Sequence, residues 1–156
     1  WADGDKQIVP AAWAKLDTGQ QAQALYDFTL NTLTALDRKG LMPEMVQVGN
    51  ETNPELMGGT KDRPINWLRN AKLLNAGIRA VRDAGKTATL NPRVMLHIAQ
   101  PENVEPWFEA ATAAGVSDYD VIGISYYRKW STRGISQLTI CQSPRIHRSC
   151  RRTSLP

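Results

Sequence analysis

A carboxylic acid directly follows an apolar segment at residues 45–51, which read Met-Val-Gln-Val-Gly-Asn-Glu. Short apolar runs of this kind predict strands of a buried parallel sheet, so Glu51 is expected where such a strand stops. Partial desolvation raises the pKa of a carboxyl group, which suits it to donate a proton to a leaving oxygen near neutral pH. Glu51 is therefore the first candidate for chemistry, as a proton donor.

Three helix-like stretches, each followed by an apolar run, would position this carboxyl. Helical periodicity with capping residues runs from Asp17 to Gly40, from Trp67 to Gly85 and from Asn103 to Gly115. The apolar runs lie at 45–49, 94–98 and 121–125. Because crossovers between such strands are right-handed, the three strands are expected to be parallel neighbours. This order fits either three-eighths of a closed barrel or part of an open sheet.

Alternation along the strands predicts which side chains share the face away from the helices. On the first strand Glu51 falls on that face, and on the second His97 does. On the third strand Tyr127 follows the same alternation, if the pleat continues beyond Ser125. Since catalytic groups of strand–helix barrels sit at the carboxyl ends of the strands, Glu51, His97 and Tyr127 are predicted to converge on one mouth.

An acid at a strand end could be one of the two carboxyl groups that glycoside hydrolysis requires. Retaining glycosidases need two carboxyl groups about 5–5.5 Å apart, one as acid/base and the other as nucleophile. Asn50, beside Glu51, could hydrogen-bond a sugar hydroxyl. An Asn-Glu pair by itself is common, so its place after a predicted strand carries the argument.

Several segments together resemble the endo-β-1,4-galactanases of glycoside hydrolase family 53. They are Trp1-Ala-Asp3 with Lys6-Gln7, Met45-Val-Gln-Val-Gly-Asn-Glu51, Leu73-Leu-Asn-Ala-Gly-Ile-Arg-Ala-Val-Arg82, Val94-Met-Leu-His-Ile-Ala99, Pro101-Glu-Asn-Val104 and Asp118-Tyr-Asp-Val-Ile-Gly-Ile-Ser-Tyr-Tyr127. The resemblance implies an α/β fold, a partial (β/α)8 TIM barrel with about three of eight strands and their helices. Residues 1–130 would be the central part of that catalytic domain.

The resemblance also implies an activity: endo-hydrolysis of β-1,4-galactosidic bonds in arabinogalactan, a plant cell-wall galactan, by a retaining mechanism. Glu51 matches the acid/base of the family, and Asn50 matches the asparagine that precedes it. The nucleophile of the family is a glutamate after its seventh strand, and no residue after Asp120 is Asp or Glu. We therefore expect this chain to be inactive alone. A secreted or periplasmic monomer is expected for such an enzyme.

Four further residues are predicted to bind substrate or to orient the acid. His97 could touch the sugar or orient Glu51, or be a hydrogen-bonded core residue. Either Tyr126 or Tyr127 could hold the carboxylate of the nucleophile in an intact enzyme, while the other packs. Trp1 could be a sugar-stacking platform, although a structural role is as reasonable. No metal-ligand cluster or phosphate-binding loop stands out, so neither metal nor cofactor is expected.

The last part of the chain differs in kind from the rest. Residues 128–156 hold seven of the nineteen basic residues, both cysteines and none of the fifteen acidic residues. A nucleic-acid-binding arm would need a basic patch or repeat, which 143–152 lacks, so we expect 131–156 to be a non-native or disordered tail and no nucleic-acid partner. Apolar runs are too short to cross a membrane.

A rival interpretation belongs to another class of protein. The aromatic and polar mouth could bind galactan without cleaving it, as a non-catalytic binding module. Cleavage and binding assays separate the two.

Overall fold

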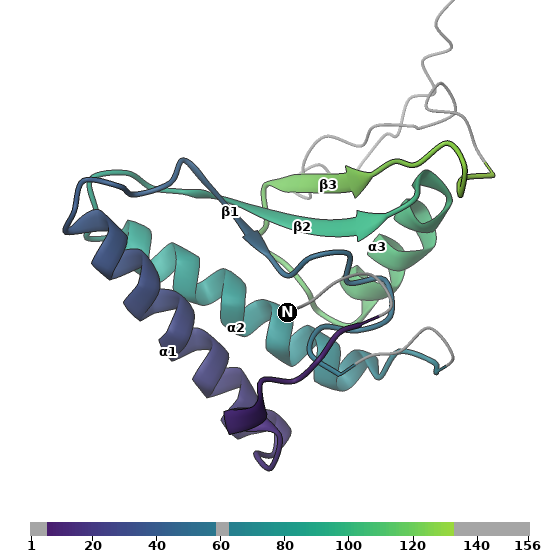
Figure 1. The fold of residues 1–156 in the computed structure, drawn as a ribbon, viewed down its shortest axis with the longest axis horizontal. Helices are drawn as coiled ribbons and strands as arrows, with labels where there is room; N and C mark the ends of the chain where they lie inside the picture. The colour runs from purple at the N-terminus through teal and green to yellow at the C-terminus, as the bar shows by residue number, and fades with distance from the viewer. Residues whose placement is uncertain (1–5, 59–62, 133–156) are drawn as a thin grey trace, which may run out of the picture.

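The computed structural model describes residues 6–58 and 63–132 (Figure 1). Its elements, in order, are η1 (Ala11–Trp13), α1 (Thr18–Asp37), β1 (Met45–Val48), α2 (Trp67–Gly85), β2 (Arg93–Ala99), η2 (Pro101–Asn103), α3 (Val104–Ala113) and β3 (Val121–Ser125). The predicted alternation of helices and strands is confirmed. All but Ser131 and Thr132 of the predicted tail lie outside the described residues, as does Trp1.

Local capping residues set where the helices begin and end. At α1, Asp17 accepts a hydrogen bond from the backbone N–H of Gln20 at 2.8 Å, and the Gln20 side chain accepts one from the N–H of Asp17 at 3.0 Å. Asn103 was expected to cap α3, but its side chain donates to the Ala99 carbonyl instead. Gly115 adopts a left-handed φ of 86° just after α3, as its position predicts.

The strands form one parallel sheet in the order β1-β2-β3, which confirms the predicted neighbours. Val48 pairs with Leu96, and His97 pairs with Gly123. Figure 1 shows α1 and α2 side by side along one side of this sheet, with α3 near the carboxyl ends of β2 and β3. Because the strands are parallel, the segments that follow them meet at one end of the sheet.

The core lies between the sheet and its helices. Val94, Leu96 and Ile98 of β2 are completely buried on the helix-facing side, as the alternation predicts. They meet the apolar face of α2, whose fully buried members include Leu73, Leu74 and Val81.

The opposite face of the sheet carries Met95 and His97. A side chain at Gly123 would come within 2.6 Å of the Met95 sulfur and 3.0 Å of His97 Cδ2. Both side chains therefore lie over Gly123, on the face away from the helices, which confirms the predicted faces of β2 and β3. No helix in the described part of the chain is long and apolar enough to span a bilayer.

Candidate active site at the carboxyl ends of the strands

Glu51 lies in a tight turn immediately beyond β1. Its φ is 45°, in the left-handed region that residues other than glycine rarely adopt. Gly49, two residues earlier, has a φ of 82°, and a side chain there would come within 2.5 Å of Thr52 Cγ2. The turn therefore needs glycine at position 49, and it holds Glu51 in a conformation that costs about 1–3 kcal/mol unless the surroundings fix it.

His97 binds the backbone of Glu51. The Glu51 N–H donates to His97 Nδ1 over 3.0 Å, so Nδ1 must be an unprotonated acceptor. The other ring nitrogen, Nε2, lies 3.1 Å from Ser125 Oγ. Because Nδ1 is unprotonated, Nε2 carries the ring proton and donates a hydrogen bond to the hydroxyl oxygen. The ring is neutral, and it links the turn after β1 to the end of β3.

Burial also favours the neutral form of the His97 imidazole, as these hydrogen bonds do. The residue is 9% exposed, and its desolvation lowers the pKa of the imidazole below the usual value, while the smaller effect of the Glu51 carboxylate acts in the opposite direction. The imidazole is therefore neutral near pH 7, as its hydrogen bond from the Glu51 N–H requires.

Thr52 attaches the turn to β2 and to α3. Its N–H and its hydroxyl both donate to the His97 carbonyl, at 3.0 and 3.2 Å. Its own carbonyl accepts from the indole Nε1–H of Trp107 at 3.2 Å. Thr52 is completely buried. The residue after Glu51 is thus fixed from two elements.

Gln7 holds the same turn from the other side. Its Nε2 donates to the carbonyl of Asn50 at 2.8 Å and to that of Glu51 at 3.2 Å. The sequence did not predict this role. Gln7 is noted above only as part of the motif Lys6-Gln7, in a segment without periodicity. Gln47, on the open face of β1, donates to Asn50 Oδ1 at 3.1 Å. Asn50 and Glu51 are therefore anchored through their backbone and through one amide oxygen.

Tyr126 and Tyr127 follow β3 at the same end of the sheet, and no hydrogen bond among the described residues joins either to Glu51. Tyr126 is partly buried and Tyr127 is 55% exposed, just beyond the end of β3. The segment after them is tied to η2 by Glu102, whose carboxylate accepts from Ser131 Oγ at 2.8 Å and from the Thr132 N–H at 3.0 Å. The structure thus brings Asn50, Glu51 and His97 together at the turn after β1.

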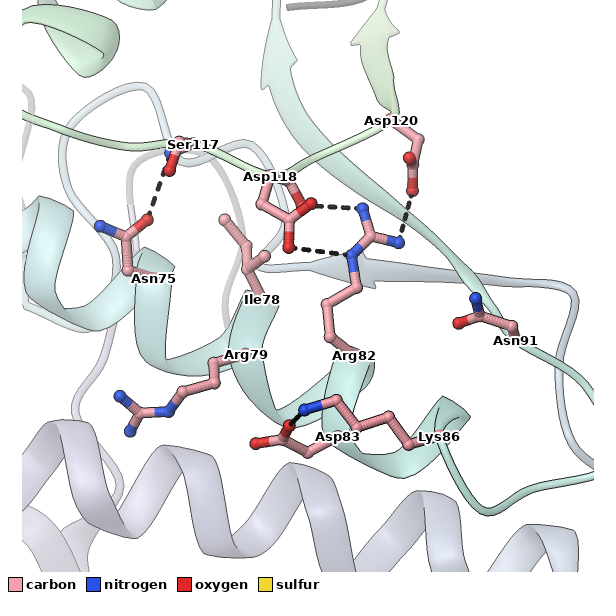
Figure 2. Close-up of a pocket in the computed structure, with 10 residues that line it drawn as sticks. All are labelled: Asn75, Ile78, Arg79, Arg82, Asp83, Lys86, Asn91, Ser117, Asp118 and Asp120. Carbon is pink, nitrogen blue, oxygen red and sulfur yellow. Dashed lines mark hydrogen bonds and ion pairs between the residues drawn. The ribbon is translucent and has the colours of Figure 1, made fainter. Parts of the chain in front are cut away.

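A groove in the described part of the chain lies elsewhere (Figure 2). It has a volume of about 690 Å³ and lies at the amino ends of β2 and β3, beside Asn91 and Asp120. There Arg82 lies between Asp118 and Asp120, with nitrogen–oxygen distances of 3.3 and 2.9 Å. With Arg79, Lys86 and Asp83 also lining the groove, its formal charges are three positive and three negative, which sum to zero. The described residues contain no group of three or more metal-ligating side chains.

Residues 1–142 match glycosyl hydrolase family 53. The chain belongs to this family. An arabinogalactan endo-beta-1,4-galactanase of Cellvibrio japonicus (strain Ueda107) is 51% identical over 143 residues, which cover 88% of this chain and 38% of that protein. An endo-beta-1,4-galactanase of Bacillus subtilis (strain 168) is 39% identical over 132 residues, with 83% and 29% covered.

Solved structures of family 53 share the fold. The Ignisphaera aggregans GH53 catalytic domain superposes with a TM-score of 0.73 at 34% identity, covering 84% of this chain and 35% of that one. A fungal beta-1,4-galactanase superposes with a TM-score of 0.72 at 28% identity, covering 81% and 39%. The three parallel strands are therefore part of a TIM barrel, not of an open sheet. The chain spans well under half the length of these family 53 relatives.

Proposed function

We propose that this chain carries the proton-donor segment of an arabinogalactan endo-β-1,4-galactanase. In this proposal Glu51 is the acid/base and Asn50 binds the sugar 2-hydroxyl. The observation that supports it most directly is the contrast within Glu51: its backbone N–H and carbonyl are both hydrogen-bonded, while no hydrogen bond from a described residue reaches its carboxylate. A general acid must be fixed in place yet keep its carboxyl available to the leaving oxygen.

The proposed reaction is a retaining double displacement, which needs a second carboxylate as nucleophile. Residues 121–156 contain no Asp or Glu, so the part of the chain that follows β3 cannot supply it. We propose that the chain alone is inactive, since a lone acid can neither form nor collapse a glycosyl-enzyme intermediate. The nucleophile would come from another part of a complete barrel.

The proposed substrate is plant cell-wall galactan. Besides Asn50, the proposed sugar contacts are Tyr126, Tyr127 and Trp1, whose ring faces suit the apolar side of a pyranose. We propose a secreted or periplasmic monomer, because a wall polysaccharide is too large to enter a cell. Residues 1–130 would form the barrel segment, and 131–156 a tail with no part in catalysis and no nucleic-acid partner.

A chimeric enzyme tests this proposal. Residues 6–132 replace the matching segment of the Cellvibrio japonicus relative, and release of reducing ends from β-1,4-galactan is measured. The chimera is expected to cleave galactan, and Glu51→Gln in it is expected to lower kcat by about a thousandfold or more, since the leaving oxygen then receives no proton. Glu44→Gln, an exposed acid before the amino end of β1, is the matched control. Equal activity of the two variants would remove Glu51 from the mechanism.

A second function follows from the same lack of acidic residues after β3. The chain could bind galactan without cleaving it, as a non-catalytic module. Titration of the 156-residue chain with galacto-oligosaccharides, combined with a reducing-end assay, separates the two. Binding without cleavage supports the module, whereas cleavage by the chain alone requires a second carboxylate among its own acidic residues.

A further inference from the structure

We propose that His97 and Gln7 are positioning residues that fix the backbone of Glu51 and so direct its carboxyl. The inference deepens the proposed function, because it takes Glu51 as the proton donor. It gives His97 a role through the main chain rather than a contact with substrate. It also assigns Gln7, in the segment before η1, a role in the site.

The backbone of Glu51 requires support because it lies in the left-handed region. A glutamate relaxes from this conformation unless several contacts hold it there. Its N–H bonds His97 Nδ1 at 3.0 Å and its carbonyl bonds Gln7 Nε2 at 3.2 Å. Both backbone groups of this residue are thus satisfied by side chains from distant parts of the sequence. The two backbone groups of Glu51 thus depend on side chains of β2 and of the segment before η1.

Both positioning side chains are too buried to serve substrate. Gln7 is 2% exposed and His97 is 9% exposed. Gln7 Oε1 is buried and has no hydrogen-bond partner among the described residues, so within that part of the chain only the NH2 group of Gln7 is used. The contacts of this buried amide are therefore its hydrogen bonds to the carbonyls of Asn50 and Glu51. We infer that holding these two carbonyls is its role.

Ser125 pairs with the ring form of His97 that can act in this way. An imidazole accepts from an N–H only at an unprotonated nitrogen, and Nδ1 is unprotonated in the neutral ring when Nε2 carries the proton. Ser125 Oγ, at 3.1 Å, accepts that proton's hydrogen bond. The Glu51 N–H can only donate, so it requires the tautomer with an unprotonated Nδ1, and the Ser125 hydroxyl at the end of β3 accepts from the Nε2–H of that form.

Nuclear magnetic resonance of the ¹⁵N-labelled 156-residue chain tests the proposal without any catalysis. We expect a two-bond nitrogen–nitrogen coupling between the Glu51 amide and His97 Nδ1, and ring shifts of the neutral Nε2-protonated form. His97→Asn keeps an acceptor near the position of Nδ1, whereas His97→Gln keeps a polar group only near Nε2. Amide exchange at Glu51 is therefore expected to rise about tenfold in His97→Gln and to change little in His97→Asn.

In the same chain labelled with both ¹³C and ¹⁵N, the direction of the carboxyl is read from the Glu51 side-chain Cδ resonance. This resonance is expected to move in His97→Gln and in Gln7→Met and to stay in place in His97→Asn. Ser125→Ala, which keeps His97, removes the acceptor of the Nε2–H, so the ring is less firmly held and the coupling is expected to weaken. It therefore tests the proposal even if a substitution at position 97 unfolds the chain.

Three results would overturn the positioning role: an Nδ1-protonated ring, no coupling in the wild-type chain, or equal exchange at Glu51 in His97→Gln and His97→Asn. None of them depends on galactan. Loss of the proposed function would instead appear as an inactive chimera, or as equal activity of its Glu51→Gln and Glu44→Gln variants. The two failures are thus distinguished by separate measurements.

Discussion

The indole Nε1–H of Trp107 donates to the carbonyl oxygen of Thr52 over 3.2 Å. This hydrogen bond links α3 to the residue next to Glu51, across 55 positions of sequence. The Trp107 ring is itself fixed by edge contacts with Trp67 and Phe108, with centroids 5.4 and 4.8 Å apart. The rings of Trp67, Trp107 and Phe108 therefore support the turn that contains Glu51, the proton-donor candidate.

Trp107→Phe tests the importance of this hydrogen bond. The substitution keeps an aromatic ring but leaves the buried Thr52 carbonyl without its indole donor, so the free energy of unfolding is expected to fall by about 2–3 kcal/mol. Urea unfolding of both proteins measures it. Trp13→Phe is the control, because the Trp13 indole N–H makes no hydrogen bond within the described residues and its partly buried ring meets the Phe28 ring edge-on. Similar losses in both variants would contradict the argument.

Acid should weaken the fold through His97. Burial lowers the pKa of this imidazole in the folded chain, below the value of about 6.5 expected when unfolded. The unfolded state then binds more protons, so this stability is complete above about pH 6.5 and is lost as pH falls through the folded pKa. The free energy of unfolding of the wild type should decline over that window more steeply than that of His97→Asn. If the unfolding free energies of the two proteins changed with pH in the same way, His97 would not contribute to the pH dependence of stability.

Much of the fold could be predicted because it depends on local patterns. The periodicity of α2, the apolar runs and the glycine at position 115 identify the elements without knowledge of their packing. The right-handed crossover rule then gives the strand order, and alternation gives the faces of Val94 and His97. The choice between a barrel and an open sheet needed the family resemblance, since three strands alone fit both.

The contacts within the site could not be predicted from those patterns. Glu51 could be placed at a strand end, but its left-handed backbone depends on Gly49 and on two distant side chains. Gln7 lies 44 residues before Glu51 in a segment with no periodic signal, so nothing in the sequence pairs them. The hydrogen bond between His97 and Ser125 follows from register, which alternation alone does not fix. Tertiary contacts of this kind become visible only once the strands are in place.

Arg69 joins the loop after β1 to both neighbouring helices. Its guanidinium lies 2.5 Å from Glu55 Oε1 and also donates to the Gln21 side chain and to the Leu56 and Met57 carbonyls. Arg69→Met would leave the nearly buried Glu55 carboxylate without its cation, so a loss of about 3 kcal/mol in the free energy of unfolding is expected.

A double-mutant cycle isolates this ion pair. Adding Glu55→Gln to Arg69→Met removes the unpaired charge, so the double variant should recover part of the loss. Arg79→Met is the control, because Arg79 is exposed and lies over the Tyr26 ring at 4.8 Å; it should cost less than about 1 kcal/mol. Additive effects of the Arg69 and Glu55 substitutions would mean that the two side chains do not interact.

Gly77 sets how closely α2 approaches β1. A side chain at this position would come within 2.6 Å of Val48 Cγ1, in the buried core. Gly77→Ala should therefore lower the free energy of unfolding by about 1–3 kcal/mol, although alanine is the better helix former. Gly19→Ala is the matched control in α1, because its new methyl group meets only the ends of the Asp17 and Lys72 side chains; it should leave stability unchanged or raise it slightly.

The same close approach predicts a compensating substitution. Val48→Ala removes the methyl groups that Gly77→Ala would strike, so the double variant should be more stable than the sum of the two single losses implies. Because Val48 is the last residue of β1 and precedes the turn to Glu51, Gly77→Ala should also perturb the Glu51 amide resonance, and Val48→Ala should restore it. Unfolding free energies that add simply, with an unchanged Glu51 resonance, would mean that the helix shifts away without moving the strand.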